Sequence, residues 1–499
     1  MGTKLTRRAF VKVAGAGGAW LALFGLAGCE SEASVRAAAS PARVGQTWAF
    51  RSRPDLTPPP VEVTTPARGT AQGYVLAAAK NGPGEEYPAQ DGPMILDNEG
   101  RPVWFRPVPS EEQDAMDFRV QRYRGEPVLT WWEGVHGGFG RGEYLIFDES
   151  YREVARFGAG NGYEGDHHEF LITDRDTALV LIYHKVPMDL SAVGGPKEGE
   201  ALDGIAQEID IETGEVLFEW HSLEHVGLDE SLYEPPPDLE NAFDYFHINS
   251  IEEDGDGHLL VSARRTSTVY KIDRKTGEII WRLGGEKSNF EMGEGARFAY
   301  QHDARRQPDG TISIFDNRGA GMDQQSRGIV LELDEDAMKA TLAREYTHPD
   351  APFATYQGNV QVLGNGNVFV GWGSAPYLSE YDGDGRLLFD ARFPSDVESY
   401  RAFRHPWKGL PKDRPAVAVE SGPEGRATLY ASWNGATEVA VWEVLAGPGP
   451  DGLEAVGSAP RKGFETTIAL RTEEPYVAAR ARDRSGRVLG TSEAVRPRR

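Results

Sequence analysis

Apolar and polar residues alternate along most of the chain in short runs that end at Gly, Asp or Asn. From residue 71 to about 405 these runs read as strands and turns, with no helical periodicity longer than a short segment. Alternating runs separated by short turns are typical of β-hairpins. The hydrophobic pattern therefore predicts an all-β protein.

One hairpin pattern recurs six times. A strand ends near an acidic residue, a short turn containing Gly or Asp follows, and an apolar, often aromatic strand leaves the turn. The acidic positions lie about 50 to 60 residues apart, enough for one four-stranded repeat, and are Asp97, Asp148, Asp210, Asp273, Asp334 and Asp382.

A second set of strand pairs lies between these hairpins. Its clear members run over 170–182, 251–263, 304–315 and 360–370, and less clear relatives run over 118–132 and 73–78. Two hairpins per repeat, six times, predict a six-bladed β-propeller over residues 48–410. A sandwich or a closed barrel is the alternative, but neither naturally repeats a four-strand unit six times.

The long period stops after Trp407. Residues 413–499 contain short alternating strands, with Trp433 on an early strand and Tyr476 before an Asp/Gly turn. This pattern resembles a fibronectin type III or immunoglobulin-like β-sandwich. We find no catalytic constellation there, and the sequence does not identify a protein or glycan partner for it.

The N-terminus has the pattern of an export signal. Arg7 and Arg8 precede an uncharged run from Val13 to Gly28 that is too short to span a bilayer comfortably. The paired arginines resemble a twin-arginine signal, and Leu26 to Cys29 matches a bacterial lipobox. We expect residues 1–28 to be a signal peptide, Cys29 to be lipidated, and 29–47 to be a tether. The mature protein is then anchored to the outer face of the cytoplasmic membrane.

Composition narrows the function. The chain has 53 Lys and Arg against 77 Asp and Glu, a formal net charge of −24. Such an acidic surface repels phosphate backbones, which argues against nucleic-acid binding. Cys29 is the single cysteine, so an internal disulfide is excluded and stability must come from packing.

Histidines recur at one position of the predicted repeat. Aligning the inner hairpins by their turns places His168, His247 and His302 near the start of the first strand in three successive blades. The adjacent ends of the partner strands carry His184, Arg264 and Asn317. Because innermost propeller strands line the central channel, we expect these six side chains to converge at one mouth of it.

The segments around these residues resemble ordered motifs of the bacterial arylsulfotransferase family. The motifs are Asp166 to Phe170, Phe246 to Ile251, Ser262 to Arg264 and Tyr300 to Ala304. The family consists of six-bladed propellers that transfer a sulfuryl group from an aryl sulfate to a phenol without a nucleotide donor. The resemblance thus implies small-molecule aryl sulfate and phenol substrates, and no cofactor.

The resemblance also implies residue roles. His302 matches the nucleophile, which becomes a sulfohistidine. His247, Asn249, Arg264 and His168 match groups that hold the sulfuryl or phenolic oxygens, and Asn317 should lie beside His302. A neutral imidazole is an adequate nucleophile near pH 7, while Arg and His neutralise charge on the equatorial oxygens. Since donor and acceptor are both phenols, one His serves alternately as acid and base.

Three other functions are alternatives. Clustered histidines suit a transition metal, although Arg264 would repel a cation. A quinone-cofactor dehydrogenase is also a propeller, but usually has eight blades and an acidic calcium site. A non-enzymatic, surface-anchored binding protein is the third, and it would not need a buried His and Arg set.

Overall fold

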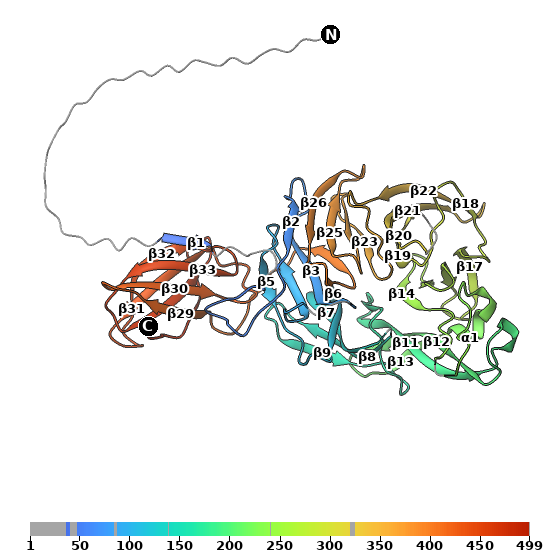
Figure 1. The fold of residues 1–499 in the computed structure, drawn as a ribbon, viewed down its shortest axis with the longest axis horizontal. Helices are drawn as coiled ribbons and strands as arrows, with labels where there is room; N and C mark the ends of the chain where they lie inside the picture. The colour runs from blue at the N-terminus through green and yellow to red at the C-terminus, as the bar shows by residue number, and fades with distance from the viewer. Residues whose placement is uncertain are drawn as a thin grey trace, which may run out of the picture. The chain divides into compact units, whose positions relative to one another are not determined.

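The computed structural model describes residues 36–39, 47–83, 87–137, 139–239, 241–319 and 325–498. These residues are almost entirely β-structure (Figure 1), which confirms the predicted all-β class. Helical turns in this part of the chain are limited to α1 (Ser222–His225) and two 3₁₀ segments, Ser191–Val193 and Leu228–Glu230. Among the described residues no helix is long and apolar enough to cross a lipid bilayer.

Residues 62–405 form six sheets, which we call blades 1 to 6. Blade 1 contains β3 (Tyr74–Asn81), β4 (Gly92–Leu96) and β5 (Pro102–Phe105), and both β27 (Val397–Glu398) and β28 (Ala402–His405) pair with β3. Blade 2 contains β6 (Asp114–Tyr123), β7 (Glu126–His136), β8 (Gly140–Phe147) and β9 (Glu153–Phe157). Blade 3 contains β10 (Phe170–Ile172), β11 (Thr177–Met188), β12 (Gly199–Asp210) and β13 (Val216–His221).

The remaining blades follow in chain order around the ring (Figure 1). Blade 4 contains β14 (Ile248–Glu253), β15 (Leu259–Ala263), β16 (Thr268–Ile272) and β17 (Ile279–Gly284). Blade 5 contains β19 (His302–Arg306), β20 (Ile312–Asp316), β21 (Arg327–Asp334), β22 (Lys339–Tyr346) and β18 (Glu291–Met292). Blade 6 contains β23 (Asn359–Val362), β24 (Val368–Gly371), β25 (Tyr377–Tyr381), β26 (Leu387–Arg392) and β2 (Glu62–Thr65).

The six acidic turn positions each connect the third and fourth antiparallel strands of a blade. The carboxylate of Asp97 accepts the backbone N–H of Glu99 at 3.0 Å, and Asp148 accepts that of Ser150 at 2.8 Å. The same local bond recurs at the other four turns. An Asp side chain that bonds backbone two or three residues on stabilises a turn wherever it occurs, which is why the sequence located these hairpins correctly.

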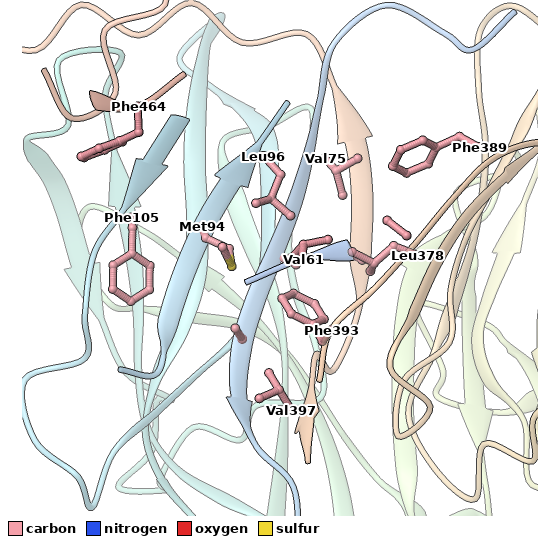
Figure 2. Close-up of a cluster of buried hydrophobic side chains, with 14 of the residues drawn as sticks. Val61, Val75, Met94, Leu96, Phe105, Leu378, Phe389, Phe393, Val397 and Phe464 are labelled. Carbon is pink, nitrogen blue, oxygen red and sulfur yellow. The ribbon is translucent and has the colours of Figure 1, made fainter. Parts of the chain in front are cut away.

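Two strands from distant parts of the chain close the ring. β28 pairs with β3, and β2 pairs with β26, so the blades at the two ends of the repeat each receive a strand from the opposite terminus. Apolar side chains of blades 1 and 6 then share one core cluster (Figure 2). Val75 and Met94 come from blade 1, and Leu378 and Phe389 come from blade 6. This exchange of strands holds the ends of the repeat together.

Residues 416–491 form a separate pair of sheets. One contains β29 (Ala416–Ser421), β30 (Arg426–Ser432), β33 (Glu465–Arg471) and β1 (Arg36–Ala39), and the other contains β31 (Val441–Gly447), β32 (Glu454–Pro460), β34 (Tyr476–Arg482) and β35 (Val488–Thr491). Trp442, Leu429 and Ile468 are buried between them. The predicted sandwich is therefore present. Within the predicted tether 29–47, β1 pairs with β33, while the predicted signal segment and Cys29 lie outside the described residues.

A buried ionic network joins all six blades at the inner strands. The carboxylate of Glu169, before β10, receives hydrogen bonds from Arg119 of β6, Arg305 of β19 and Arg401, which precedes β28. Arg401 also donates to the carbonyl of Asn249 in blade 4 at 3.0 Å. Asp303 accepts from the backbone N–H of Val360 in blade 6 at 3.3 Å. We call this set the Glu169 network.

The charges of the Glu169 network compensate one another. Glu169 and Arg401 are both fully buried, and burial alone would raise the pKa of Glu169. The charges of Arg305, Arg401 and Arg119 instead hold that pKa well below its ordinary value. Breaking a buried pair by removing one partner leaves the other charge without compensation, at a cost of about 3–5 kcal/mol.

We predict that Glu169→Gln lowers the free energy of unfolding by about 3 kcal/mol or more, because three buried arginines lose their shared carboxylate. Urea denaturation followed by tryptophan fluorescence measures the change. Glu212→Gln is the control, since Glu212 pairs with Arg124 at an exposed site and its replacement should cost less than about 0.5 kcal/mol. Equal effects from both variants would contradict the role given to Glu169.

Candidate active site

Four of the predicted site residues line one cavity at the inner strands of blades 3, 4 and 5. His168, His247 and His302 precede or begin β10, β14 and β19, and Arg264 follows β15. The cavity has a volume of about 370 Å³, enough for a single-ring compound. In an antiparallel hairpin the start of one strand lies beside the end of the next, so Arg264 donates its backbone N–H to the carbonyl of His247 at 2.8 Å.

Hydrogen bonds fix the tautomer of His302. The Asn317 amide nitrogen donates to the carbonyls of Ala354 and Gln357, both at 2.9 Å, which leaves its Oδ1 as an acceptor. His302 Nδ1 lies 2.7 Å from that oxygen and therefore carries the proton. Nε2 is the unprotonated nitrogen, and it accepts the backbone N–H of Gln357 at 3.2 Å.

The environment of His302 disfavours its charged form. Its side chain is only 1% exposed. Burial, together with the positive charge of Arg264, lowers the pKa of His302 well below its ordinary value. His302 is consequently a neutral imidazole at pH 7, with a lone pair on Nε2.

The other two histidines are oriented by carboxylates. His247 Nδ1 lies 2.5 Å from Asp244, and His168 Nδ1 lies 2.5 Å from Asp166. Both imidazoles thus donate through Nδ1 and leave Nε2 without a hydrogen bond to any described residue. His247 has a φ of 56°, a left-handed conformation that non-glycine residues rarely adopt and that is often kept at functional sites.

Arg264 brings a positive charge to the cavity without a carboxylate partner among the described residues. One of its terminal nitrogens donates to the Thr355 carbonyl at 3.1 Å, and its Nε has no hydrogen-bond partner. The guanidinium also lies 5.3 Å from the centre of the Tyr300 ring. A planar cation with free donors is suited to an anion with several oxygens.

Three predicted residues do not reach the cavity. Asn249 is fully buried beneath it, where its amide nitrogen donates to the Gln301 carbonyl at 2.6 Å and its Oδ1 is unpartnered. Asn317 does not line the cavity and accepts the Nδ1 proton of His302. The expectation that His184 joins the cluster was wrong. The backbone N–H of Asp166 bonds to the carbonyl of Leu181, and β11 continues past that point, so His184 is exposed and lies against Tyr163.

Several residues of the cavity wall were missed in the sequence. They are Lys80 near the end of β3, His136 at the end of β7, Glu398 of β27, and His167, which follows Asp166. His136 is the last residue of the second strand in blade 2, and Arg264 comes directly after the second strand in blade 4. Aligning the repeats could therefore have predicted His136. Lys80 and Glu398 had none, because they meet only when β27 pairs with β3.

In the described part of the chain, His247 and His302 are not part of a group of residues that could hold a metal ion. Within the described ranges, the one group of three His, Cys, Asp or Glu with ligand atoms close enough for a metal is Asp166, His167 and His168. Asp166 already accepts the His168 backbone N–H at 2.9 Å and its Nδ1. These bonds occupy the carboxylate and orient His168 toward the cavity. The arrangement suits proton transfer and anion binding better than metal coordination.

Comparison with solved structures finds low similarity. A protein of unknown function from Bacteroides caccae is 13% identical, with a TM-score of 0.40, over 67% of this chain and 100% of that one. A streptogramin B lyase is 10% identical, with a TM-score of 0.35, over 83% of this chain and 98% of the lyase. These values carry no argument about function. No curated protein matches the chain.

A match to a family profile assigns the chain to a protein family. The profile described as arylsulfotransferase (ASST) matches residues 119–394, which is more than half of the chain. The match includes His168, His247, Arg264 and His302, the four predicted residues that line the cavity. The chain belongs to the arylsulfotransferase (ASST) family.

Proposed function

We propose that this protein transfers a sulfuryl group from an aryl sulfate to a phenol through a covalent sulfohistidine at His302. The observation that carries the proposal is that one cavity contains a neutral His302 with a fixed tautomer and Arg264, which has no carboxylate partner among the described residues. A nucleophile and a cation for the transferred group are the two requirements of this chemistry.

In the first half-reaction, the hydrogen bond from the Gln357 backbone N–H to His302 Nε2 breaks, and the freed lone pair of Nε2 attacks the sulfur of the aryl sulfate. An N–S bond forms, the S–O bond to the aryl oxygen breaks, and the electron pair leaves on that oxygen. The departing phenolate takes a proton from the His168 imidazolium, which Asp166 stabilises through Nδ1. The sulfuryl group then remains on His302 and the phenol is free to leave.

In the second half-reaction, the acceptor phenol occupies the place of the first. Neutral His168 accepts its proton through Nε2, the phenolic oxygen attacks sulfur, and the N–S bond breaks. Electrons return to His302 Nε2, which regenerates the neutral imidazole. Because the two half-reactions are mirror images, the same groups serve both.

The equatorial sulfuryl oxygens need donors throughout. Arg264 offers its unpartnered Nε and guanidinium charge. His247 uses its Nδ1 proton for Asp244, so its Nε2 donates to a sulfuryl oxygen only when the ring is protonated, and burial lowers the pKa of His247. The Gln357 backbone N–H, which points at His302 Nε2, is placed to donate to a sulfuryl oxygen once the N–S bond has formed. Donors that are already fixed in place stabilise the transition state without reorganisation.

A binding protein without catalysis is the second candidate. It would explain the sandwich and the acidic surface. It would not explain why a buried imidazole lies beside an unpaired guanidinium, an arrangement that costs stability and is typical of catalytic sites. Transfer is therefore the better-supported function.

We predict that His302→Gln lowers sulfuryl transfer at least about 10³-fold, because glutamine fills the space but provides no nucleophilic nitrogen. The assay uses 4-nitrophenyl sulfate and phenol, and mass spectrometry under alkaline quench maps the sulfated peptide. His184→Gln is the matched control, since His184 lies outside the cavity, and it should keep normal activity. Product formation by His302→Gln near the normal rate would contradict the proposal.

We predict that Arg264→Lys lowers kcat/KM about 10- to 100-fold, because lysine keeps the charge but loses the planar group that holds two oxygens. The measurement is steady-state kinetics with 4-nitrophenyl sulfate. Arg124→Lys, at an exposed ion pair, is the control. An Arg264→Lys enzyme with unchanged kcat/KM would assign the sulfuryl contacts to other donors.

We also propose that the protein is exported by a twin-arginine signal and anchored to the outer face of the cytoplasmic membrane through diacylated Cys29. The support is the N-terminal sequence, from Arg7 and Arg8 to the lipobox before Cys29. A diacyl group provides stable attachment.

We predict that Cys29→Ala moves the protein from the membrane fraction to the soluble extracytoplasmic fraction, since no thiol remains to be acylated. Immunoblotting of cell fractions measures the distribution, and labelling with a radioactive fatty acid tests the modification. Ser31→Ala, which keeps the lipobox intact, is the control. Membrane association and migration that stay unchanged in Cys29→Ala would refute the anchor.

A further inference from the structure

The cavity has a second polar wall that the sulfuryl chemistry does not use. It consists of Lys80 at the end of β3, Asp114 at the start of β6 and Glu398 of β27, which all line the same cavity as His302. All three lie outside residues 119–394, the range that matches the family profile, whereas the histidines and Arg264 lie inside it. The match to the family profile therefore does not cover this wall. We call it the distal wall.

Lys80 and Glu398 form a buried ion pair in the distal wall. Their side chains are each 5% exposed, and their residues are register partners across β3 and β27. Glu398 also accepts from the Gln357 side-chain amide at 3.3 Å and from the Tyr356 hydroxyl at 3.4 Å. Glu398 thus has three donors among the described residues. Lys80 has three N–H donors and a single hydrogen-bond acceptor among the described residues, so it retains donors for a ligand.

Asp114 is an acceptor of the distal wall that no described residue binds by a hydrogen bond. Its side chain is 23% exposed, and its carboxylate accepts no hydrogen bond from any described residue. The nearest basic group, His136 Nδ1, lies 3.7 Å away, beyond hydrogen-bond distance. Gln357 adds a second unpartnered acceptor, since its buried Oε1 has no donor. A ligand with a hydrogen-bond donor can therefore bind the Asp114 carboxylate without displacing a protein donor among the described residues.

The charges of the distal wall decide which ligand group fits. A carboxylate on the ligand would meet Asp114 and Glu398, and an ammonium group would meet Lys80. A hydroxyl group is neutral, donates to the Asp114 carboxylate and accepts from the Lys80 ammonium. The cavity volume of about 370 Å³ accommodates one substituted ring between Arg264 and this wall.

We propose that the distal wall binds a second hydroxyl group on the phenol, so that dihydroxyaromatic compounds are the preferred substrates. The inference rests on the proposed function for the position of the reacting hydroxyl at His168 and His302. Lys80 and Asp114 are then the residues that determine specificity. Glu398 holds Lys80 in place.

The test measures binding of four phenols that differ only in the group opposite the reacting hydroxyl: methyl, hydroxyl, carboxylate and aminomethyl. Ligand-observed NMR titration of the full chain gives the dissociation constants. The dihydroxy compound should bind at least about tenfold more tightly than the methyl compound, because it gains a hydrogen bond to a charged group. It should also bind more tightly than the two charged compounds.

Asp114→Ala should reduce the preference for hydroxyl over methyl to about one. Glu112→Ala is the matched control, because Glu112 is an exposed acid two residues earlier and does not line the cavity. Asp114→Asn keeps the size of the side chain and one acceptor oxygen, and it should retain part of the preference. This variant covers the case in which Asp114→Ala fails to fold.

Three results would overturn the proposal. Equal binding of the hydroxyl and methyl compounds would show that the distal wall does not bind a polar group on the ring. Tightest binding of the carboxylate compound would make Lys80 dominant, and tightest binding of the amine would make the Asp114 charge dominant. Binding does not require turnover, so an inactive wild-type protein would refute the proposed function while leaving this test intact.

Discussion

The structure depends on the buried ion pairs between Glu169 and the arginines of other blades at the centre of the ring. Glu169 accepts hydrogen bonds from arginines of three other blades, and Arg401 extends the contacts to Asn249. The buried charges of Glu169 and Arg401 are compensated only by residues of other blades, and leaving either without a partner is unfavourable by several kcal/mol. The charges are satisfied only when the blades assemble with the correct neighbours. The network therefore couples the closure of the ring to the geometry of its centre.

The same strand segments build both the network and the active site. His168 precedes Glu169, and His302 precedes Asp303. The imidazole of each pair lines the cavity, while the carboxylate contacts Arg401. A shift of a blade that breaks the network would therefore also displace a cavity histidine.

The arginines of the Glu169 network are compensated by carboxylates, and the arginine of the cavity is not compensated by a described carboxylate. In the Glu169 network every buried guanidinium has a carboxylate, whereas Arg264 in the cavity has none among the described residues. Arg264 lowers the pKa of His302 in addition to the effect of burial. In the proposed mechanism, the cation that binds the sulfuryl oxygens would thus also keep the nucleophile neutral. At the distal wall, Lys80 pairs with Glu398, and Asp114 has His136 Nδ1 at 3.7 Å. The cavity thus has a cation without a carboxylate partner among the described residues near His302, and two carboxylates at the distal wall.

The sequence by itself determined the features that depend on local interactions. The Asp turns were correctly located because each carboxylate bonds backbone two or three residues away, and the hairpins brought His247 beside Arg264 and His302 beside Asn317 through short loops. Only the tertiary structure decided what depends on long-range pairing. Lys80 and Glu398 meet because β27 pairs with β3 across 318 residues, and no periodic signal marks that pairing. The exclusion of His184 also depended on three-dimensional register, since hairpin alignment by turns does not fix how far each partner strand extends past the cavity.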